Sequence, residues 1–429
     1  MLDIIFQFPK SAIYFFRFSR KYVNKAVYRH IMAMVLAIIL LRGRRTYANV
    51  TRLFLESRDK SCISKCFKNS VFPGFPMQEH LHKRLLGEAL EITKKRIIHL
   101  IIDSTAQKKR GKNMENTIIY KKGYTRDHFF IMGILYFPDT GVRIPLPRRL
   151  YRTRAYCKKH NIKYRTQTKL AETMIRYANL PDDVEVIVIF DSFFPSENII
   201  KTIRQKGYHF VCSVKSNRVD VDSDKQVKEI CEEHISEGHI KNRTEIRVPS
   251  KRSRYNHASA QRYETKIFIT YTEKLRLSKM GEVQVIFSRK ETDDNQLKHM
   301  RYIATDMLYL STVQILTIYS YRWQIELYFK ELKSYLGLGN YQMLSFGAII
   351  RHVDCVIMAF MYLEHTRIIK LKEHPQEKQW IYARTLQMSY VVQHEIRMTN
   401  LDYLKRAFKK GKDIDELEQK LIEKLPLVA

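Results

Sequence analysis

The sequence predicts an α/β fold in which a core β-sheet is interrupted by a β-rich insertion and flanked by helical segments at both ends. Two observations carry this prediction. Buried strand patterns alternate with helical ones between residues 96 and 215, and further strand-like segments follow before helical periodicity returns. Alternating strands and helices are typical of a sheet that helices cover. We therefore divide the 429 residues into five segments: 1–95, 96–215, 216–305, 306–370 and 371–429.

The first segment, 1–95, is predicted to be a helical and basic domain. Its apolar run Ile31–Leu41 is followed by three arginines and by a helix start at Thr46. Short helices joined by tight turns resemble a helix-turn-helix in outline, but they also occur in all-α domains that bind no DNA. Both interpretations stay open, and the basic charge favours a DNA-binding domain.

Neither a membrane segment nor an export signal is expected. The longest apolar run, Ile31–Leu41, has 11 residues, whereas a membrane-spanning helix needs about 20. Asp3 stands where a signal peptide is positively charged, and Lys10 and Arg17 interrupt its apolar core. The six cysteines lack the paired spacing of a zinc site, so we expect reduced thiols in a cytoplasmic protein.

The core begins with a strand, Arg96–Asp103, whose unbroken apolar run predicts a central strand buried on both faces. Residues 128–137 and 142–146 form a predicted hairpin, and Pro145 in its second arm predicts an edge. After a basic stretch come a helix at 166–180, a strand at 184–191, a helix at 195–206 and a strand at 209–215. Three strands followed by alternating helices and strands is the order of the ribonuclease H-like fold.

The insertion, 216–305, contains four segments of strand-like composition bounded by polar loops: 245–250, 266–272, 282–290 and 300–306. After it, Ser311 starts a capping box and Gly337 suits a helix C-terminus, so one long helix is predicted between them. A second apolar helix at about 344–370 is expected to pack behind it. The segment 371–429 is predicted to be a helical tail that contributes to dimerisation.

The long helix carries polar residues at helical spacing within an apolar segment. Tyr319, Arg322, Glu326 and Lys333 follow one another at steps of +3, +4 and +7, which predicts that they line one face of a single helix. One acid therefore lies among three groups that can contact phosphate. The alternative interpretation is a solvated charged face, because such pairs are common on helices.

Two further acids end predicted strands. Asp103 follows the first strand and Asp191 the fourth, and these strands are neighbours in the ribonuclease H-like fold. Together with Glu326, they offer the carboxylates that two Mg²⁺ ions need for phosphoryl transfer on nucleic acid. Each Asp alone is weak evidence, because an Asp after a strand is also a common turn or helix-capping residue, so the joint order is what carries the interpretation.

The charge predicts a polyanionic partner. The chain has 76 Lys+Arg against 44 Asp+Glu, a formal charge of +32, and an excess of this size points to nucleic acid or an anionic membrane. The 26 tyrosines and 22 phenylalanines favour nucleic acid. Candidate contacts to the DNA backbone flank the predicted catalytic strands: Arg148, Arg149, Lys215 and Arg218. For any one of them, a solvated loop position is the alternative.

The chain resembles the DDE transposases of bacterial insertion sequences, in particular the branch with the signature Tyr-x2-Arg-x3-Glu-x6-Lys. Tyr319, Arg322, Glu326 and Lys333 fit this signature without a gap, after two strand-end aspartates. The resemblance covers residues 96 to 370. It implies that Asp103, Asp191 and Glu326 are a catalytic triad that binds two Mg²⁺ ions, with Mn²⁺ as a substitute. It also implies that Tyr319, Arg322 and Lys333 contact phosphates near the cleaved end.

The resemblance further implies an endonuclease and strand transferase that binds the terminal inverted repeats of its element. The expected mode is cut-and-paste transposition of double-stranded DNA by a homodimer in a paired-end complex. The resemblance also implies that the protein is cytoplasmic and nucleoid-associated and that it has no membrane or small-molecule partner. Some relatives flip a base with an aromatic side chain of the insertion, for which Tyr271 and Tyr302 are candidates here, although core positions are the alternative.

Two other functions stay open. A structure-specific nuclease or resolvase on the same fold would keep the three acids, but it would not explain the signature or the long β-rich insertion. A catalytically silent DNA-binding relic would explain the charge, but the intact Asp103, Asp191 and Glu326 argue against it.

Overall fold

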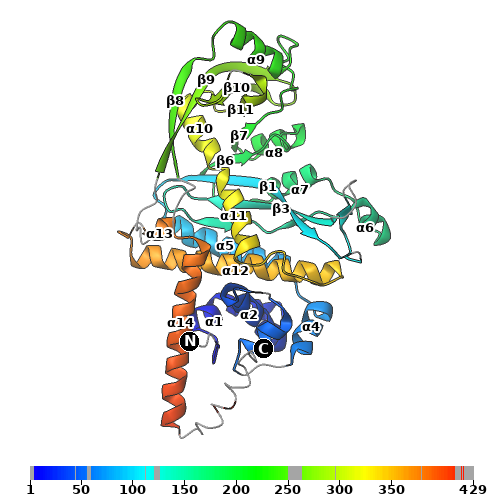
Figure 1. The fold of residues 1–429 in the computed structure, drawn as a ribbon, viewed down its shortest axis with the longest axis vertical. Helices are drawn as coiled ribbons and strands as arrows, with labels where there is room; N and C mark the ends of the chain where they lie inside the picture. The colour runs from blue at the N-terminus through cyan, green and yellow to red at the C-terminus, as the bar shows by residue number, and fades with distance from the viewer. Residues whose placement is uncertain are drawn as a thin grey trace.

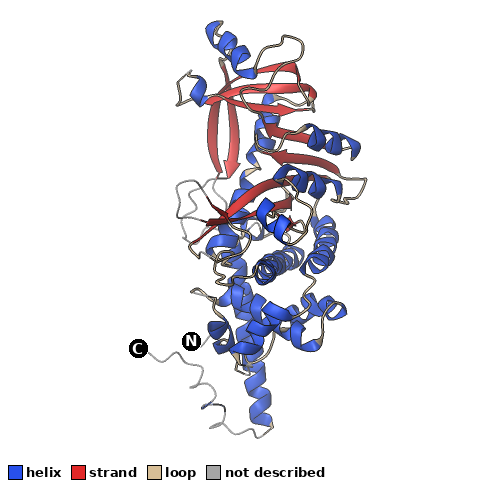
Figure 2. Ribbon diagram, turned by 90° about the vertical axis from the view of Figure 1, so that its right-hand side faces the viewer, coloured by secondary structure: helices blue, strands red, loops and turns tan. Residues whose placement is uncertain are grey.

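The computed structural model describes residues 4–43, 45–55, 59–111, 113–119, 126–249, 263–294, 296–377 and 379–410, together with 417 and 419. The molecule is elongated, with a strand-rich end, a central sheet and a helical end (Figure 1). Figure 2 shows the strands gathered in the upper half, with helices among them, and mainly helices in the lower half. The mixed α/β architecture that the sequence predicts is confirmed in this coarse form.

One large mixed sheet runs through the described residues in the order β2-β3-β1-β6-β7-β11-β10-β9-β8, and β4 and β5 pair with β3. Its strands are β1 Ile97–Lys109, β2 Ile118–Ile119, β3 Arg126–Tyr136, β4 Arg143–Pro145, β5 Arg149–Leu150, β6 Glu185–Phe190, β7 His209–Ser213, β8 Asn242–Pro249, β9 Tyr263–Leu277, β10 Gly281–Lys290 and β11 Arg301–Thr305. Strands β6 and β7 run parallel to β1, and β3 runs antiparallel to it. All four strands predicted in the insertion are present.

The insertion continues the core sheet. Strand β11 pairs antiparallel with β7, and β10 pairs with β11, so hydrogen bonds connect the insertion to the core. The core path runs from β4 through β3, β1 and β6 to β7, so that β1 and β6 are neighbours. One boundary differs from the prediction, because β1 does not end at Asp103 but extends to Lys109 along β3.

Helices cover both faces of the core strands. Figure 1 shows α7 (Gln167–Arg176) and α8 (Glu197–Gln205) on one side, and α5 (Gly74–Ile92) and α12 (Phe346–Glu373) on the other. The remaining helices are α1 Lys10–Phe16, α2 Lys25–Leu40, α3 Tyr47–Arg52, α4 Lys60–Asn69, α6 Arg154–Lys159, α9 Val227–Ser236, α10 Thr312–Ser320, α11 Trp323–Ser334, α13 Gln379–Tyr382 and α14 Thr385–Lys409, with short 3-10 turns at Arg17–Lys21 and Leu297–His299.

Helix α12 is the centre of the helical end. It contacts α2, α4, α5 and α14, which come from both ends of the chain. Among the described residues it is the one helix long and apolar enough to cross a membrane, yet 83% of its apolar window is buried inside the protein. Its apolar surface is therefore accounted for by core packing. The apolar run of α2 is likewise buried, as the sequence predicts.

The prediction of a single long helix after the insertion is wrong. The chain forms α10 and α11, separated at Tyr321 and Arg322, where the backbone N–H groups bond three residues back, to Ile318 and Tyr319. Helix α10 packs on β7, β8 and β11, whereas α11 packs on β1, β3 and α12. Because a sheet twists from strand to strand, one straight helix cannot pack along both sets of strands. The break between α10 and α11 lets each helix align with the strands on which it packs.

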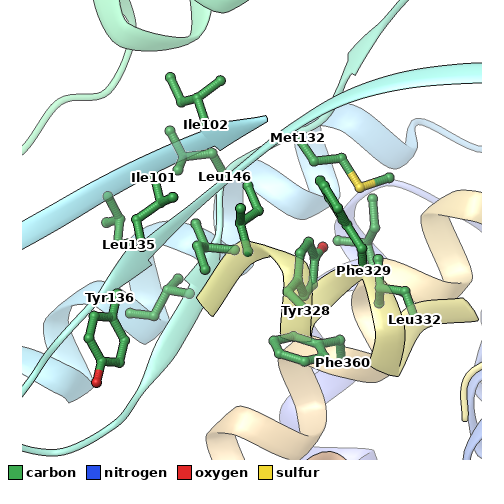
Figure 3. Packing of buried hydrophobic residues seen from close by; sticks show 14 of the residues in the cluster. Ile101, Ile102, Met132, Leu135, Tyr136, Leu146, Tyr328, Phe329, Leu332 and Phe360 are labelled. Atoms are coloured by element: carbon green, nitrogen blue, oxygen red, sulfur yellow. The ribbon is translucent and has the colours of Figure 1, made fainter. Parts of the chain in front are cut away.

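The apolar face of α11 fixes its position on the core. Figure 3 shows Tyr328, Phe329 and Leu332 packed toward residues of β1 and β3, with Phe360 of α12 beneath them. Tyr328 is fully buried, and its ring meets that of Phe360 edge-on at a centroid distance of 4.7 Å. The polar residues of α11 lie on the part of its surface that does not pack into this apolar core.

Candidate active site

Strand register brings the two predicted aspartates to the same level of the sheet. The parallel pairing of β1 and β6 ends with Ile101 opposite Ile189. Asp103 and Asp191 each lie two residues further along, so both side chains point to the same face as that last pair. Asp191 directly follows β6, and its Oδ1 accepts a hydrogen bond of 2.9 Å from the Phe193 N–H. The expected neighbourhood of these two acids thus follows from the backbone pairing.

Helix α11 brings Glu326 to the same region through an arginine. Arg322, at the break between α10 and α11, lies with its Nη1 3.5 Å from Asp103 Oδ2. Its Nη2 pairs with Glu326 Oε1 one turn along the helix. The guanidinium is therefore placed between two of the three acids, one from the sheet and one from the helix.

The acids form one electrostatic cluster. The pKa of Asp103 is raised to about 6, because burial and the negative charges of Asp191 and Glu326 outweigh the opposing effects of the Ser104 N–H and the Arg322 guanidinium. The Ser104 N–H donates to Asp103 Oδ1 at 2.7 Å. Three carboxylates face one guanidinium, so the site has an excess of negative charge in a partly buried position.

This donor set suits a hard divalent cation, because Mg²⁺ and Mn²⁺ prefer carboxylate oxygen. Asp103, Asp191 and Glu326 are the residues that could hold it. Their oxygens are not drawn tightly together, since among the described residues only His234, Glu237 and His239 form a group with all ligand atoms within 4.8 Å. The Arg322 guanidinium lies in this wider space and partly neutralises Asp103 and Glu326.

The other two signature residues lie at opposite ends of the region. Burial raises the pKa of Tyr319, in the last turn of α10, and the charge of Arg322 opposes that shift. Lys333 is in the last turn of α11, where burial lowers its pKa and the charge of Asp127 on β3 opposes the change. The signature is thus distributed over two helices, and Tyr319 rather than Lys333 lies beside the acids.

The structure places the four other predicted DNA-contacting residues in different environments. Arg148 is only 7% exposed, and its Nη2 donates to Asp354 Oδ2 of α12 at 2.8 Å. It is therefore a buried structural residue rather than part of the basic surface. Arg149 is half-buried against the Phe75 ring, with its guanidinium carbon 4.8 Å from the ring centroid.

Arg218 is also used within the fold, because it donates hydrogen bonds to the carbonyl oxygens of Pro195 and Ser278 at 2.6 and 3.1 Å. Lys215 is exposed, and it lines an open groove of about 560 Å³. The groove adjoins Asp191, since the next residue in the chain is among those that line it: Ser192, Ser213, Val214, Lys215, Ser216, Asn217, Met300, Arg301 and Tyr302. Of the four, Lys215 has the placement that a phosphate contact near the acids requires.

The aromatic candidates of the insertion occupy packed positions. Tyr302 is 6% exposed, and its ring packs edge-on to Phe287 at 5.8 Å. Tyr271 packs against His234 with ring centroids 4.3 Å apart. Tyr302 therefore takes the core position that the sequence left as the alternative, whereas Tyr271 is half-buried against the core.

Sequence reasoning missed a second polar cluster, on the other side of α11. Arg143 Nη1 of β4 lies 2.8 Å from Glu331 Oε2, and its Nη2 lies 3.5 Å from Glu364 Oε1. Arg367 pairs with the same Glu364 oxygen at 3.4 Å. All four side chains are at most 4% exposed. The residues come from three distant segments, so no local spacing could have revealed the cluster.

The chain is similar to a known family over its core and its insertion. The model described as transposase DDE domain matches residues 94–361, which is more than half of the 429 residues. The matched span contains the core strands, the insertion, Asp103, Asp191 and Glu326. No curated protein matches the chain.

Proposed function

Because the chain belongs to the family of transposase DDE domains, whose members act on DNA and use divalent metal ions, we propose that it moves its own element by cut-and-paste transposition. It binds the terminal inverted repeats, cleaves the DNA at their edges and joins the freed 3′ ends to a target. We further assign it to the insertion-sequence branch with the Tyr-x2-Arg-x3-Glu-x6-Lys signature, on a ribonuclease H-like core.

The observation that carries this proposal is the convergence of Asp103, Asp191 and Glu326. Register places the two aspartates level with one another, and Arg322 links Asp103 to Glu326. When bound, two Mg²⁺ or Mn²⁺ ions supply activation of the attacking oxygen and neutralisation of the leaving oxygen. The three carboxylates bind these ions, and burial in the cluster strengthens the interactions by limiting the access of water.

The cationic residues hold the DNA. Arg322, which lies between Asp103 and Glu326, would contact a phosphate of the bound strand, and Lys333 would contact the backbone at the far end of α11. Tyr319 donates its phenol O–H to a phosphate beside Asp191. Lys215 binds the strand that enters the groove, and Arg149 and Arg218 add to the positive charge that attracts the DNA backbone.

We assign roles to the flanking segments on the same basis. Residues 1–95 recognise the terminal repeat, and residues 371–429 take part in the homodimer that cuts two ends in one complex. The formal charge of +32 suits a cytoplasmic protein held on the nucleoid.

The test is Mg²⁺-dependent cleavage of a labelled duplex that carries the inverted repeat flanking the gene. The wild type, Asp191→Ala and the control Asp182→Ala are compared at the same low salt, because Asp182 is an exposed acid just before β6. We expect nicking at the repeat edge by the wild type and the control, and none by Asp191→Ala. Binding without cleavage by the wild type would contradict catalysis and favour a DNA-binding relic. Cleavage without regard to the repeat would favour a nuclease.

A further inference from the structure

A second group of metal-ligating side chains lies in the insertion, at the corner between α9 and β8. His234, Glu237 and His239 each offer one ligand atom, and these atoms all lie within 4.8 Å of one another. The two histidine Nδ1 atoms are 3.2 Å apart, and Glu237 Oε2 is 3.2 Å from His239 Nδ1. Neither the core acids nor the signature residues take part in this group.

The end of α9 produces this arrangement. Gly238 adopts a positive φ of 67°, which is readily available to glycine, and its N–H bonds to the Ile235 carbonyl at 3.2 Å. The His239 N–H then bonds to the His234 carbonyl at 2.9 Å. These two bonds define a Schellman motif, in which the residues at either end of the turn face each other. The backbone therefore holds the two imidazoles together.

The hydrogen bond from His234 Nε2 to Glu273 leaves a lone pair on Nδ1 that can be donated to a metal ion. Its Nε2 lies 2.7 Å from Glu273 Oε2 of β9, and a carboxylate can only accept, so Nε2 carries the proton. In the neutral ring, Nδ1 then presents a lone pair toward His239 Nδ1 and Glu237. A histidine whose second nitrogen donates to a carboxylate is the usual outer arrangement of a protein metal ligand.

The distances match one tetrahedral ion. Ligand nitrogens at about 2.0–2.1 Å from a Zn²⁺ ion lie roughly 3.3 Å apart when the angle between them is tetrahedral. The Nδ1 to Nδ1 distance of 3.2 Å agrees with this geometry. A hydrogen bond between the rings would explain that distance equally, but it would not explain why a glutamate oxygen approaches the same nitrogen of His239.

We propose that His234 Nδ1, His239 Nδ1 and Glu237 bind one divalent transition-metal ion of the zinc class. Two imidazoles select such an ion over Mg²⁺, which prefers oxygen ligands, so the site is chemically distinct from the three core acids. The Tyr271 ring lies alongside His239 at a centroid distance of 5.4 Å and forms one wall of the site. The ion joins the end of α9 to the start of β8 and, through Glu273, to β9, and so stabilises the insertion.

The test is titration of the full-length protein with Zn²⁺ by calorimetry, in excess Mg²⁺ so that oxygen-rich sites are filled. The variant is His239→Ala, and the matched control is His374→Ala. Both side chains are exposed to a similar degree, 43% and 44%, and His374 also lies beside glutamates but has no second imidazole in its group. Glu237→Gln, at an exposed position, provides a second variant that leaves the buried His234 untouched.

We expect one Zn²⁺ per chain in the wild type and in His374→Ala. Affinity falls at least tenfold in His239→Ala, and it falls less in Glu237→Gln. Co²⁺ in place of Zn²⁺ gives the visible absorption bands of a tetrahedral ion in the wild type, and His239→Ala abolishes these bands. Zn²⁺ raises the melting temperature of the wild type but not that of His239→Ala. Equal Zn²⁺ affinity in the wild type and His239→Ala, or no binding by the wild type, overturns the proposal.

Discussion

Helix α11 carries two clusters of acids and arginines that differ in every respect that matters for chemistry. Glu326 shares Arg322 with Asp103 in a group of three acids and one arginine, and its side chain is 32% exposed. Glu331 lies on the other side of the helix with Arg143, Glu364 and Arg367, where two acids meet two arginines at 4% exposure or less. The helix thus separates an unbalanced polar group from a balanced one.

The difference shows what makes charged residues structural or reactive. In the buried cluster, each charge is neutralised by its neighbours, and Arg367 also donates to the Gly141 carbonyl at 2.7 Å. Such a group needs no further counter-ion, and its ion pairs connect α11, α12 and β4. In the open cluster, burial and the negative charges of Asp191 and Glu326 raise the pKa of Asp103, and the uncompensated carboxylates attract cations. Charge balance and access to water therefore separate the two roles.

The largest effect is expected from neutralising the open cluster. Glu326→Gln removes one carboxylate without changing its size, and we expect cleavage of the repeat duplex to fall by roughly a thousandfold or more, because several kcal/mol of transition-state stabilisation is lost. Stability should hold or increase, because one of three mutually repelling acids is gone. Rate measurements under single-turnover conditions, with urea unfolding of the same preparation, check both expectations. A loss of activity that simply follows a loss of folded protein would remove the distinction between the clusters.

The buried cluster should respond in the opposite way. Glu331→Gln leaves the Arg143 guanidinium buried with less compensation, and we expect the free energy of unfolding to fall by about 3–5 kcal/mol. The residual folded protein should retain its cleavage rate per folded molecule. Urea unfolding followed by circular dichroism measures the change, with Glu326→Gln on the same helix as the matched control. If the two variants unfold at the same urea concentration, the contrast drawn from burial is wrong.

The open cluster should also make the stability of the protein depend on pH. The pKa of Asp103 is about 6 in the folded chain and near 3.8 in the unfolded chain, so between those values the folded chain binds more protons. Raising the pH through this window therefore lowers the free energy of unfolding, by at most about 3 kcal/mol. We expect Asp103→Asn to flatten this part of the stability profile when metal is absent. Identical slopes for the wild type and Asp103→Asn would show that Asp103 titrates normally.

The smallest effect is expected for a single phosphate contact at the far end of α11. Lys333→Ala should weaken binding to all duplexes alike and reduce the slope of log affinity against log salt by about one. Fluorescence anisotropy at several salt concentrations measures the slope. Lys201→Ala is the charge-matched control, because Lys201 pairs with Glu197 on α8 at the opposite side of the core strands. An equal change of slope in both variants would mean that Lys333 contributes only general charge.

Sequence patterns predicted the parts of the molecule that depend on local periodicity. The strands before Asp103 and Asp191, the four strands of the insertion and the buried helices α2 and α12 follow from runs of apolar residues. The neighbourhood of Asp103 and Asp191 could be expected once the strand order was fixed, because parallel pairing sets the register. These predictions needed only near neighbours in the sequence or a single strand pairing.

The parts that were missed depend on contacts between distant segments. Nothing at Tyr321 or Arg322 breaks a helix by its own propensity, and the interruption arises because α10 and α11 pack on different parts of a twisted sheet. Arg148 has the same local appearance as its basic neighbours, but Asp354, more than two hundred residues away, makes it a buried partner. Composition could not separate it from Arg149 or Lys215.

The helical end has a consequence for how the chain is made. Its N-terminal residues and α1 are held by α14: the Phe6 N–H donates to Asn400 Oδ1 at 3.0 Å, and the Ser11 N–H donates to Glu395 Oε1 at 3.1 Å. Ribosomes deliver the N-terminal residues first, and most proteins fold their first segments as they emerge. Here the earliest helices must wait, incompletely packed, until residue 400 has been synthesised. A chain that stops short of α14 is therefore released with its first helices lacking their final partner, and premature termination exposes the beginning of the protein to proteolysis rather than its end.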